Sequence, residues 1–271
     1  MTDEPENTEH EALAKIDTSV PQSARIWNYW LGGKDNYEVD RVAGDAFRTI
    51  FPGIETGARA ARYFLARAVR HLAAEEGIRQ FLDIGTGLPS VDNTHEIAQR
   101  VVPECRIVYV DNDPLVLAHA RALLTSTPEG VTNYVDADLR DPGTIVREAG
   151  KTLNFDQPVA LMLMGILGHI EDYDEARSIV RQLVDALPSG SYLVQYDSTN
   201  TSESYVRAIQ QYNDGGSIPY ILRSPEQIAG FFEGLELLEP GVASCSRWRP
   251  DGGAWGLPAE VHQYGGVAVK R

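Results

Sequence analysis

The chain has 271 residues, with 24 basic and 39 acidic side chains and a net charge of -15. This length predicts one large domain, or one domain with an extension, and the acidic balance disfavours a nucleic acid as partner, because phosphates are bound mainly by Lys and Arg. The longest apolar run, 159–167, is far shorter than the roughly 20 residues of a membrane span, and two cysteines exclude a disulfide framework. We therefore expect a cytoplasmic protein without a membrane partner.

The first 76 residues predict a tail followed by helices. Residues 1–20 are acidic and without period, and they lack the basic start and apolar core of a secretory signal. We expect a flexible tail there. Three helices are then expected over 23–30, 37–50 and 56–76, the last with apolar residues at a spacing of four. Together 21–76 form a helical extension.

From residue 77 onward, the pattern changes to strands that alternate with helices. Strands are expected over 80–84, 106–110, 132–135, 159–164, 191–196, 236–245 and 265–269. Helices are expected over 93–101, 114–124, 142–149, 174–186, 202–212 and 225–232. This alternation predicts an α/β fold with a doubly wound, mostly parallel sheet, in which ligands bind at the carboxyl ends of the strands.

The first strand ends in a loop with two glycines, Asp83-Ile84-Gly85-Thr86-Gly87. Such a loop turns sharply and lets the backbone approach a ligand. The dinucleotide fingerprint needs a third glycine three residues after Gly87, and Ser90 stands there. The loop therefore favours a nucleoside-like ligand without a pyrophosphate, although a simple strand-to-helix turn remains open.

The second and third strands are followed by carboxylates. Asp111, with Asn112 beside it, stands where an acid accepts both hydroxyls of a ribose. Asp113 precedes a proline and fits a helix cap better. Asp138 is a candidate acceptor for an adenine amino group, and Leu139 is a candidate to pack on the ring. A solvated acidic loop is the open alternative.

The fourth strand ends at Met164 and leads through Gly165 and Gly168 to His169, the only histidine at a strand end. His169 is therefore the candidate general base, with a packed histidine as the alternative. Near the end of the chain, Trp248 and Trp255 flank a loop that either walls a substrate pocket or covers the sheet. We predict no metal site, because His-Glu-x-x-His and a cysteine pair are both missing.

In this chain order, the glycine loop, the two acids and the polar exit of the fourth strand resemble class I S-adenosylmethionine-dependent methyltransferases. The opening segment, Ala24-Arg25-Ile26-Trp27-Asn28-Tyr29-Trp30-Leu31-Gly32-Gly33-Lys34-Asp35-Asn36-Tyr37, is similar to that of an actinobacterial methyltransferase family of unassigned substrate, formerly a domain-of-unknown-function family. The resemblance covers about 20–271. Gly168 departs from it, because many relatives of the wider class carry the first His of a His-His pair there, which weakens a two-histidine mechanism.

The resemblance implies a Rossmann-like, seven-stranded sheet whose last strand is antiparallel, with S-adenosyl-L-methionine as cofactor and a small molecule as methyl acceptor. It implies a methyltransferase domain over 77–271 and a lid over the cofactor formed by 21–76; a helical buttress for the sheet stays open. The cofactor-binding residues are then expected to be Asp83, Gly85, Thr86, Gly87, Asp111, Asn112, Asp138, Leu139 and Met164. Arg25, Lys34 and Arg62 are the candidate cations for the methionine carboxylate.

Two other functions stay open at this point. An NAD-dependent oxidoreductase would use the same sheet and ribose acid, but Ser90 and Asp138 count against it. A non-catalytic module that binds S-adenosylmethionine would share every motif. The sequence does not identify the methyl acceptor or the oligomeric state.

Overall fold

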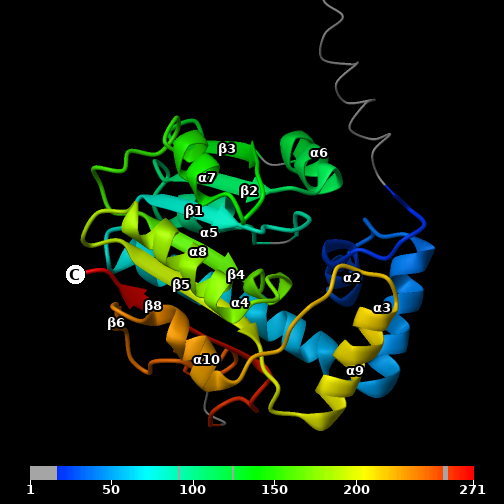
Figure 1. Cartoon of the computed structure of the whole chain (residues 1–271). Coiled ribbons are helices and arrows are strands. Elements are labelled where there is room, and N and C mark those ends of the chain that lie inside the picture. Colours follow the sequence, from blue (N-terminus) through cyan, green and yellow to red (C-terminus); the bar gives the residue numbers. More distant parts are fainter. Residues whose placement is uncertain (1–16, 91, 124, 253–255) are drawn as a thin grey trace, which may run out of the picture.

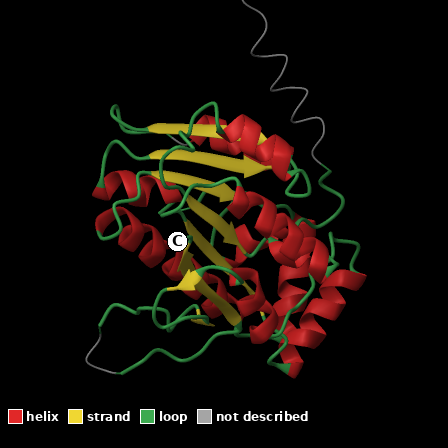
Figure 2. Ribbon diagram, turned by 60° about the vertical axis from the view of Figure 1, so that its left-hand side comes forward, coloured by secondary structure: helices red, strands yellow, loops and turns green. Residues whose placement is uncertain are grey.

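The computed structural model describes residues 17–90, 92–123, 125–252 and 256–271 (Figure 1). Most of the predicted tail and Trp255 lie outside these residues. A central sheet has helices on both faces, and a further group of helices stands beside one end of it (Figures 1 and 2). Among the helices of these ranges, none combines the length and the apolar content that a membrane crossing needs.

The sheet has the order β3-β2-β1-β4-β5-β8-β6, and β7 also pairs with β8. The first five strands pair in parallel, whereas β8 is antiparallel to β5, β6 and β7. This confirms the predicted doubly wound sheet with an antiparallel last strand. The strands are β1 (Gln80–Ile84), β2 (Arg106–Asp111), β3 (Val131–Asp136), β4 (Ala160–Met164), β5 (Tyr192–Ser198), β6 (Glu236–Leu237), β7 (Ala243–Ser244) and β8 (Gln263–Val269).

Local signals explain where the helices begin. Asn93 and Ser224 each form a capping box, and the Asp141 side chain accepts a hydrogen bond from the Thr144 backbone N–H ahead of a proline at the first helical turn. The helices are α2 (Ser23–Trp30), α3 (Glu38–Ile50), α4 (Ile54–Ala74), α5 (Thr94–Val101), α6 (Pro114–Leu123), α7 (Pro142–Ala149), α8 (Tyr173–Asp185), α9 (Glu203–Asp214) and α10 (Pro225–Ala229). There are also two short 3-10 helices in the described residues, η1 (Leu167–His169) and η2 (Gly230–Phe232).

The structure corrects the strand predicted over 236–245. The chain forms the two short strands β6 and β7, because it turns between them at Gly241, whose φ is 83°. Both strands pair with the edge of β8 that β5 leaves open. The sheet thus keeps seven positions across its width, and the two short strands share the last one.

Apolar side chains bury both faces of the sheet. On one face α4 packs its Phe64 and Leu72 into the core, and both side chains are fully buried. Trp248 belongs to the same cluster, with its ring 5.3 Å from that of Phe64, so it covers the sheet and does not line a pocket. The opposite face is covered by residues of α7 and α8.

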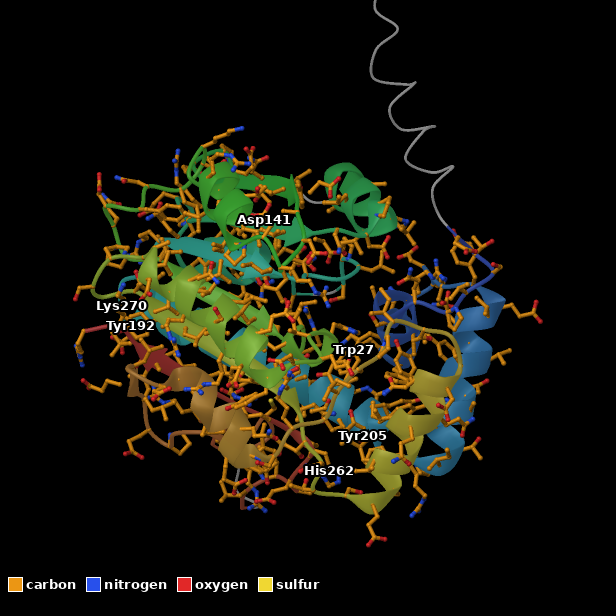
Figure 3. All side chains as sticks on the ribbon, viewed as in Figure 1. Trp27, Asp141, Tyr192, Tyr205, His262 and Lys270 are labelled. Atoms are coloured by element: carbon orange, nitrogen blue, oxygen red, sulfur yellow. The ribbon has the colours of Figure 1, made fainter. Side chains whose placement is uncertain are left out.

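A third cluster joins α2, α3, the start of α4 and α9. A buried ion pair between Arg25 and Asp40, at 2.8 Å, ties α2 to α3. This helical group stands beside the carboxyl ends of the parallel strands, and Figure 3 shows Trp27 and Tyr205 there, with Tyr192 and Lys270 at the far end of the sheet. Because α9 comes from beyond residue 77, the group is not built from the N-terminal extension alone. The domain division at 76/77 stays a prediction.

Candidate functional site

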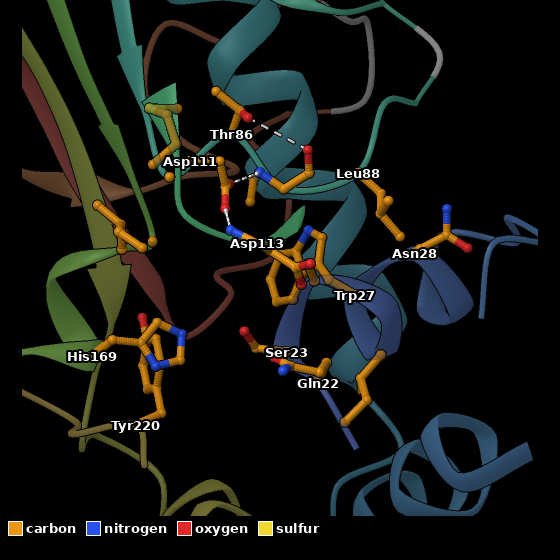
Figure 4. Close-up of a pocket in the computed structure, with 18 of the residues that line it drawn as sticks. Gln22, Ser23, Trp27, Asn28, Thr86, Leu88, Asp111, Asp113, His169 and Tyr220 are labelled. Carbon is orange, nitrogen blue, oxygen red and sulfur yellow. Dashed lines mark hydrogen bonds between the residues drawn. The ribbon is translucent and has the colours of Figure 1, made fainter. Parts of the chain in front are cut away.

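A cavity of about 450 Å³ opens at the carboxyl ends of the parallel strands. The loops after β1, β2, β3 and β4 line one side of it, and α2, α9 and the segment 218–220 line the other. Figure 4 shows Thr86 and Asp111 on the strand-end side, across from Ser23 of α2. This is the place where doubly wound sheets bind their ligands.

The glycine loop after β1 depends on backbone angles that favour glycine. Gly85 has a φ of 73° and Gly87 one of 64°. A Cβ on Gly85 would also lie 2.5 Å from Cγ1 of Ile166, on the exit of β4. The loop therefore presses against the neighbouring strand end, and it lines the cavity with Gly85, Thr86 and Gly87.

Asp111, the last residue of β2, is held by two backbone donors. Its Oδ2 accepts a hydrogen bond from the Gly87 N–H and its Oδ1 one from the Asp113 N–H, both at 3.0 Å. These bonds fix the plane of the carboxylate, and each oxygen keeps a further lone pair. Burial raises the pKa of this carboxyl. The group can therefore accept two neighbouring hydroxyls, as a ribose presents them.

The loop after β3 carries the second predicted acid. Asp138 Oδ1 accepts from the Arg140 backbone N–H at 2.8 Å, and its Oδ2 accepts from Asn112 Nδ2 at 3.4 Å. Leu139 beside it is buried and lines the cavity. Asp113 caps α6, since its Oδ1 accepts from the Leu115 N–H at 2.8 Å. The cap interpretation of Asp113 is thus confirmed.

Asp83 lies deeper, within β1. Its carboxyl is buried, and burial raises its pKa to about 6 even though Thr94 Oγ1 donates a hydrogen bond to it at 2.6 Å. Asp83 lines the cavity, as does Met164 at the end of β4.

The three candidate cations occupy different places. Arg25 is not among the described residues that line the cavity: besides its ion pair with Asp40, it donates to the backbone oxygens of Asp17 and Val20. We therefore correct the prediction for Arg25, because protein partners already use its guanidinium. Lys34 is exposed and is not among the described residues that line the cavity. Arg62 does line it, and donates to the Asp92 carbonyl at 2.8 Å.

His169 lines the cavity from η1. Its Nδ1 lies 3.0 Å from the Pro219 carbonyl oxygen. Because a carbonyl can only accept, Nδ1 carries the proton and Nε2 of the neutral ring keeps its lone pair. Burial lowers the pKa of the imidazole. The ring meets that of Tyr220 edge-on, with centroids 5.1 Å apart (Figure 4).

Tyr220 is a cavity residue that sequence reasoning missed. Its hydroxyl donates to Asp197 Oδ1 at 2.6 Å, and Asp197 is fully buried on β5. A Cβ on Gly168 would overlap the Tyr220 ring. This explains the glycine at 168, because the ring fills the space that a first histidine would need.

Asn213, near the end of α9, clamps the backbone of Tyr220. Its Nδ2 donates to the Tyr220 oxygen at 3.0 Å, and the Tyr220 N–H donates to its Oδ1 at 2.9 Å. The Ile221 N–H in turn donates to the Gly168 oxygen at 2.8 Å. The segment that holds His169 is thus fixed from two sides. No local pattern marks Tyr220, since its side-chain partners Asp197 and His169 are distant in the chain, and Asn213 is recognised only through its bonds to Tyr220.

These features suit a nucleoside ligand next to a neutral histidine. In the described part of the chain, no group of three or more His, Cys, Asp or Glu could hold a metal ion. The acids at the strand ends supply hydrogen-bond acceptors to the cavity, and His169 supplies a group that can take a proton.

Comparisons with known proteins agree with this picture. A family model described as S-adenosyl methyltransferase matches residues 9–271. A crystal structure of a DUF574 family protein from Streptomyces avermitilis is 47% identical, covers 95% of this chain and 100% of its own, and has a TM-score of 0.90. A Thermobifida fusca protein, classed provisionally as a methyltransferase, is 39% identical, with coverages of 94% and 97% and a TM-score of 0.86.

More distant structures share the fold. A SAM-dependent methyltransferase from Anabaena variabilis is 14% identical, covers 75% of this chain and 84% of its own, and has a TM-score of 0.50. A search of curated proteins gave no match.

Proposed function

The chain belongs to the S-adenosyl methyltransferase family, and we propose that its methyl acceptor is a small molecule bound in the cavity beside His169. The protein is an S-adenosylmethionine-dependent methyltransferase. The cofactor supplies a methyl group that a sulfonium already activates. None of the matches described above supports the oxidoreductase or the non-catalytic alternative.

The described residues fit this cofactor. Asp111 keeps two lone pairs for the ribose hydroxyls, and Asp138 with Leu139 suits an adenine. Arg62 is the cation among the three candidates that lines the cavity, so we assign the methionine carboxylate to it. Gly85, Thr86 and Gly87 bring backbone close to the ligand, and Asp83, Asn112 and Met164 complete the proposed contacts.

His169 is the observation that carries the proposal for catalysis. Its Nε2 has a lone pair in the same cavity as Asp111, because Nδ1 donates to the Pro219 oxygen. A neutral imidazole in that position can take a proton from the acceptor. Alignment of the two reactants within the cavity is the other large contribution to such a transfer.

Fractionation tests the acceptor class. The full chain is incubated with methyl-labelled cofactor and a bacterial extract that has been split into small molecules, proteins and nucleic acids. We expect label in the small-molecule fraction. Label confined to protein or nucleic acid would refute the proposal, as would failure of the chain to bind S-adenosylhomocysteine in a calorimeter.

The role of His169 is tested once an acceptor has been found. His169→Ala should lower turnover by about 10²–10⁴-fold and leave S-adenosylhomocysteine affinity nearly unchanged. His71→Ala is the control, because His71 lies on α4 and is not among the described residues that line the cavity. If His169→Ala keeps full turnover per folded molecule and only its melting temperature falls, the role of His169 is packing and not catalysis.

A further inference from the structure

The far side of the cavity is walled by aromatic rings. Trp27 and Trp30 of α2 meet at a centroid distance of 5.8 Å, Trp30 and Phe47 of α3 at 5.0 Å, and Phe47 and Tyr205 of α9 at 5.7 Å. All four line the cavity, as do Tyr212 and Tyr220. We call these six residues the aromatic wall. Four of its rings contact one another across α2, α3 and α9, so the wall offers a continuous aromatic surface.

The charged side chains that line the cavity come from elements other than those that carry the wall. The described residues that line it include the acids at the strand ends, together with Arg62, Arg140 and Asp35. Asp35 lies 4.0 Å from Nδ1 of His119 on α6, and Arg140 lies by Asp138. The lining residues described for α2, α3, α9 and the segment 215–222 are all uncharged.

The carboxylate behind the wall is also unavailable to a ligand. Asp197 is 0% exposed and accepts hydrogen bonds from the Tyr220 hydroxyl, the Gly168 N–H and Gln195 Nε2. An ammonium ligand would thus find no carboxylate at the wall, and a carboxylate ligand no cation. Burying an unpaired charge costs far more than burying an apolar surface.

Neutral polar groups are present at the wall. Ser198 Oγ and the Tyr205 hydroxyl lie 2.9 Å apart and both line the cavity, and Gln263 Nε2 donates to the Tyr205 oxygen at 3.1 Å. Each hydroxyl carries one proton and two lone pairs. The two hydroxyls can therefore still form a hydrogen bond with a neutral polar substituent of a ligand.

From this juxtaposition we propose that the acceptor is an uncharged, flat aromatic compound that carries a hydroxyl group. Its ring packs against the aromatic wall and its hydroxyl faces Nε2 of His169. The hydroxyl oxygen bonds to the methyl carbon as the methyl–sulfur bond breaks, and its proton goes to Nε2. The sulfonium charge is thereby neutralised and a cationic imidazole forms, so charge balances. This inference rests on the proposed function.

Binding to the full chain loaded with S-adenosylhomocysteine tests it. Four probes share one ring size: 2-naphthol, 2-naphthoate, 2-naphthylmethylamine and the saturated decahydro-2-naphthol. We expect calorimetry to show that 2-naphthol binds at least about tenfold more tightly than either charged probe. The wall offers no charged side chain that could pair with the charge of those probes. The saturated alcohol should be weaker as well, because it lacks the ring contacts.

A paired substitution tests the charge argument. Ile218 lines the cavity and is 55% exposed, so Ile218→Lys should fold and should narrow the gap between naphthoate and naphthol several-fold. Val42→Lys is the matched control, because Val42 is 62% exposed and not among the described lining residues. Its probe affinities should equal those of the wild type.

The outcomes separate the two proposals. If S-adenosylhomocysteine does not bind, the proposed function fails. If it binds and naphthol does not, or a charged probe binds as tightly as naphthol, the acceptor class alone is overturned. A naphthol preference that Val42→Lys and Ile218→Lys change alike would also overturn it.

Discussion

Asp83 and Asp111 are two buried carboxyls of one cavity with different surroundings. Asp111 accepts hydrogen bonds from two backbone N–H groups, whereas Asp83 accepts one from a threonine hydroxyl and has a pKa of about 6. Backbone donors stabilise the charged form. Asp111 is therefore the better acceptor for ligand hydroxyls, and Asp83 the better pH-sensitive group.

The first prediction concerns Asp111. Asp111→Ala should weaken the binding of S-adenosylmethionine by about 1.5–3 kcal/mol, the range for hydrogen bonds to a charged group. Titration calorimetry measures this. Asp141→Ala is the control: it removes an aspartate that also accepts a backbone hydrogen bond, at the exposed start of α7. Unchanged affinity in folded Asp111→Ala would remove Asp111 from the binding site.

A second prediction concerns the pH dependence of stability. The ordinary pKa of 3.8 is raised to about 6 at Asp83, so its contribution to folding is complete below pH 3.8 and is lost as the pH rises through about 6. Asp83→Asn does not titrate. Its free energy of unfolding relative to wild type should therefore rise by about 2–3 kcal/mol from acid to neutral pH.

Denaturant unfolding at a series of pH values checks this rise. Asp141→Asn is a control of opposite sign, because the hydrogen bonds from Thr144 lower the pKa of the Asp141 carboxyl. Its stability relative to wild type should fall as the pH rises. A flat difference for Asp83→Asn would show that Asp83 titrates alike in the folded and unfolded chain.

Elements with local signals were predictable. The helix over 142–149 agrees at both ends, because Asp141, Pro142 and Gly150 mark its limits in the sequence. The strand over 236–245 was predicted wrongly, because the turn signal Pro240-Gly241 lies inside it and the chain turns there before β7 begins. The helices predicted from 37, 93 and 202 each begin one residue later, because Tyr37, Asn93 and Ser202 are their N-caps.

The same distinction applies to the candidate site. Asp111, Asp138 and His169 meet in one cavity because the carboxyl ends of parallel strands share an edge. Tyr220 could not be predicted, because its contacts with His169 and Asp197 join a loop after α9 to β5 and the exit of β4 across the fold. Asn213 matters only because it holds the backbone of Tyr220. The interpretation of Arg25 failed for a similar reason, since Asp40 lies on another helix.

A third prediction tests the contact between the exit of β4 and Tyr220. Gly168→Ala should lower the free energy of unfolding by about 1–3 kcal/mol, because its Cβ overlaps the Tyr220 ring. Gly252→Ala is the control, since a Cβ there meets no atom within 4 Å. In Tyr220→Ala the cost of Gly168→Ala should largely vanish. If Gly168→Ala lowers the free energy of unfolding equally in wild type and in Tyr220→Ala, the strain does not come from the Tyr220 ring.

At the scale of the whole molecule, the cavity lies between two bodies of different construction. The sheet is braced on both faces, whereas the helical group of α2, α3 and α9 packs beside its end through a separate cluster. A segment with its own small cluster opens at lower free energy than a central strand. The group is therefore suited to move when a ligand enters.

The fourth prediction follows from this. Amide exchange in 20–50 and in α9 should slow when S-adenosylhomocysteine is added, because ordering raises the local opening free energy. Helix α7 serves as the internal control, since it packs on the sheet and is not among the described elements that line the cavity. If amide exchange in 20–50 is identical with and without ligand, the alternative that 21–76 forms a helical buttress for the sheet is favoured over a lid.

The placement of the tryptophans gives the molecule a built-in optical reporter. Trp27 and Trp30 line the cavity, whereas Trp248 is 0% exposed within the core on one face of the sheet. Indole emission responds to what touches the ring. In a Trp255→Phe variant, a titration followed by intrinsic fluorescence would thus report cavity occupancy through Trp27 and Trp30 over a steady signal from Trp248, without a label and before any acceptor is known.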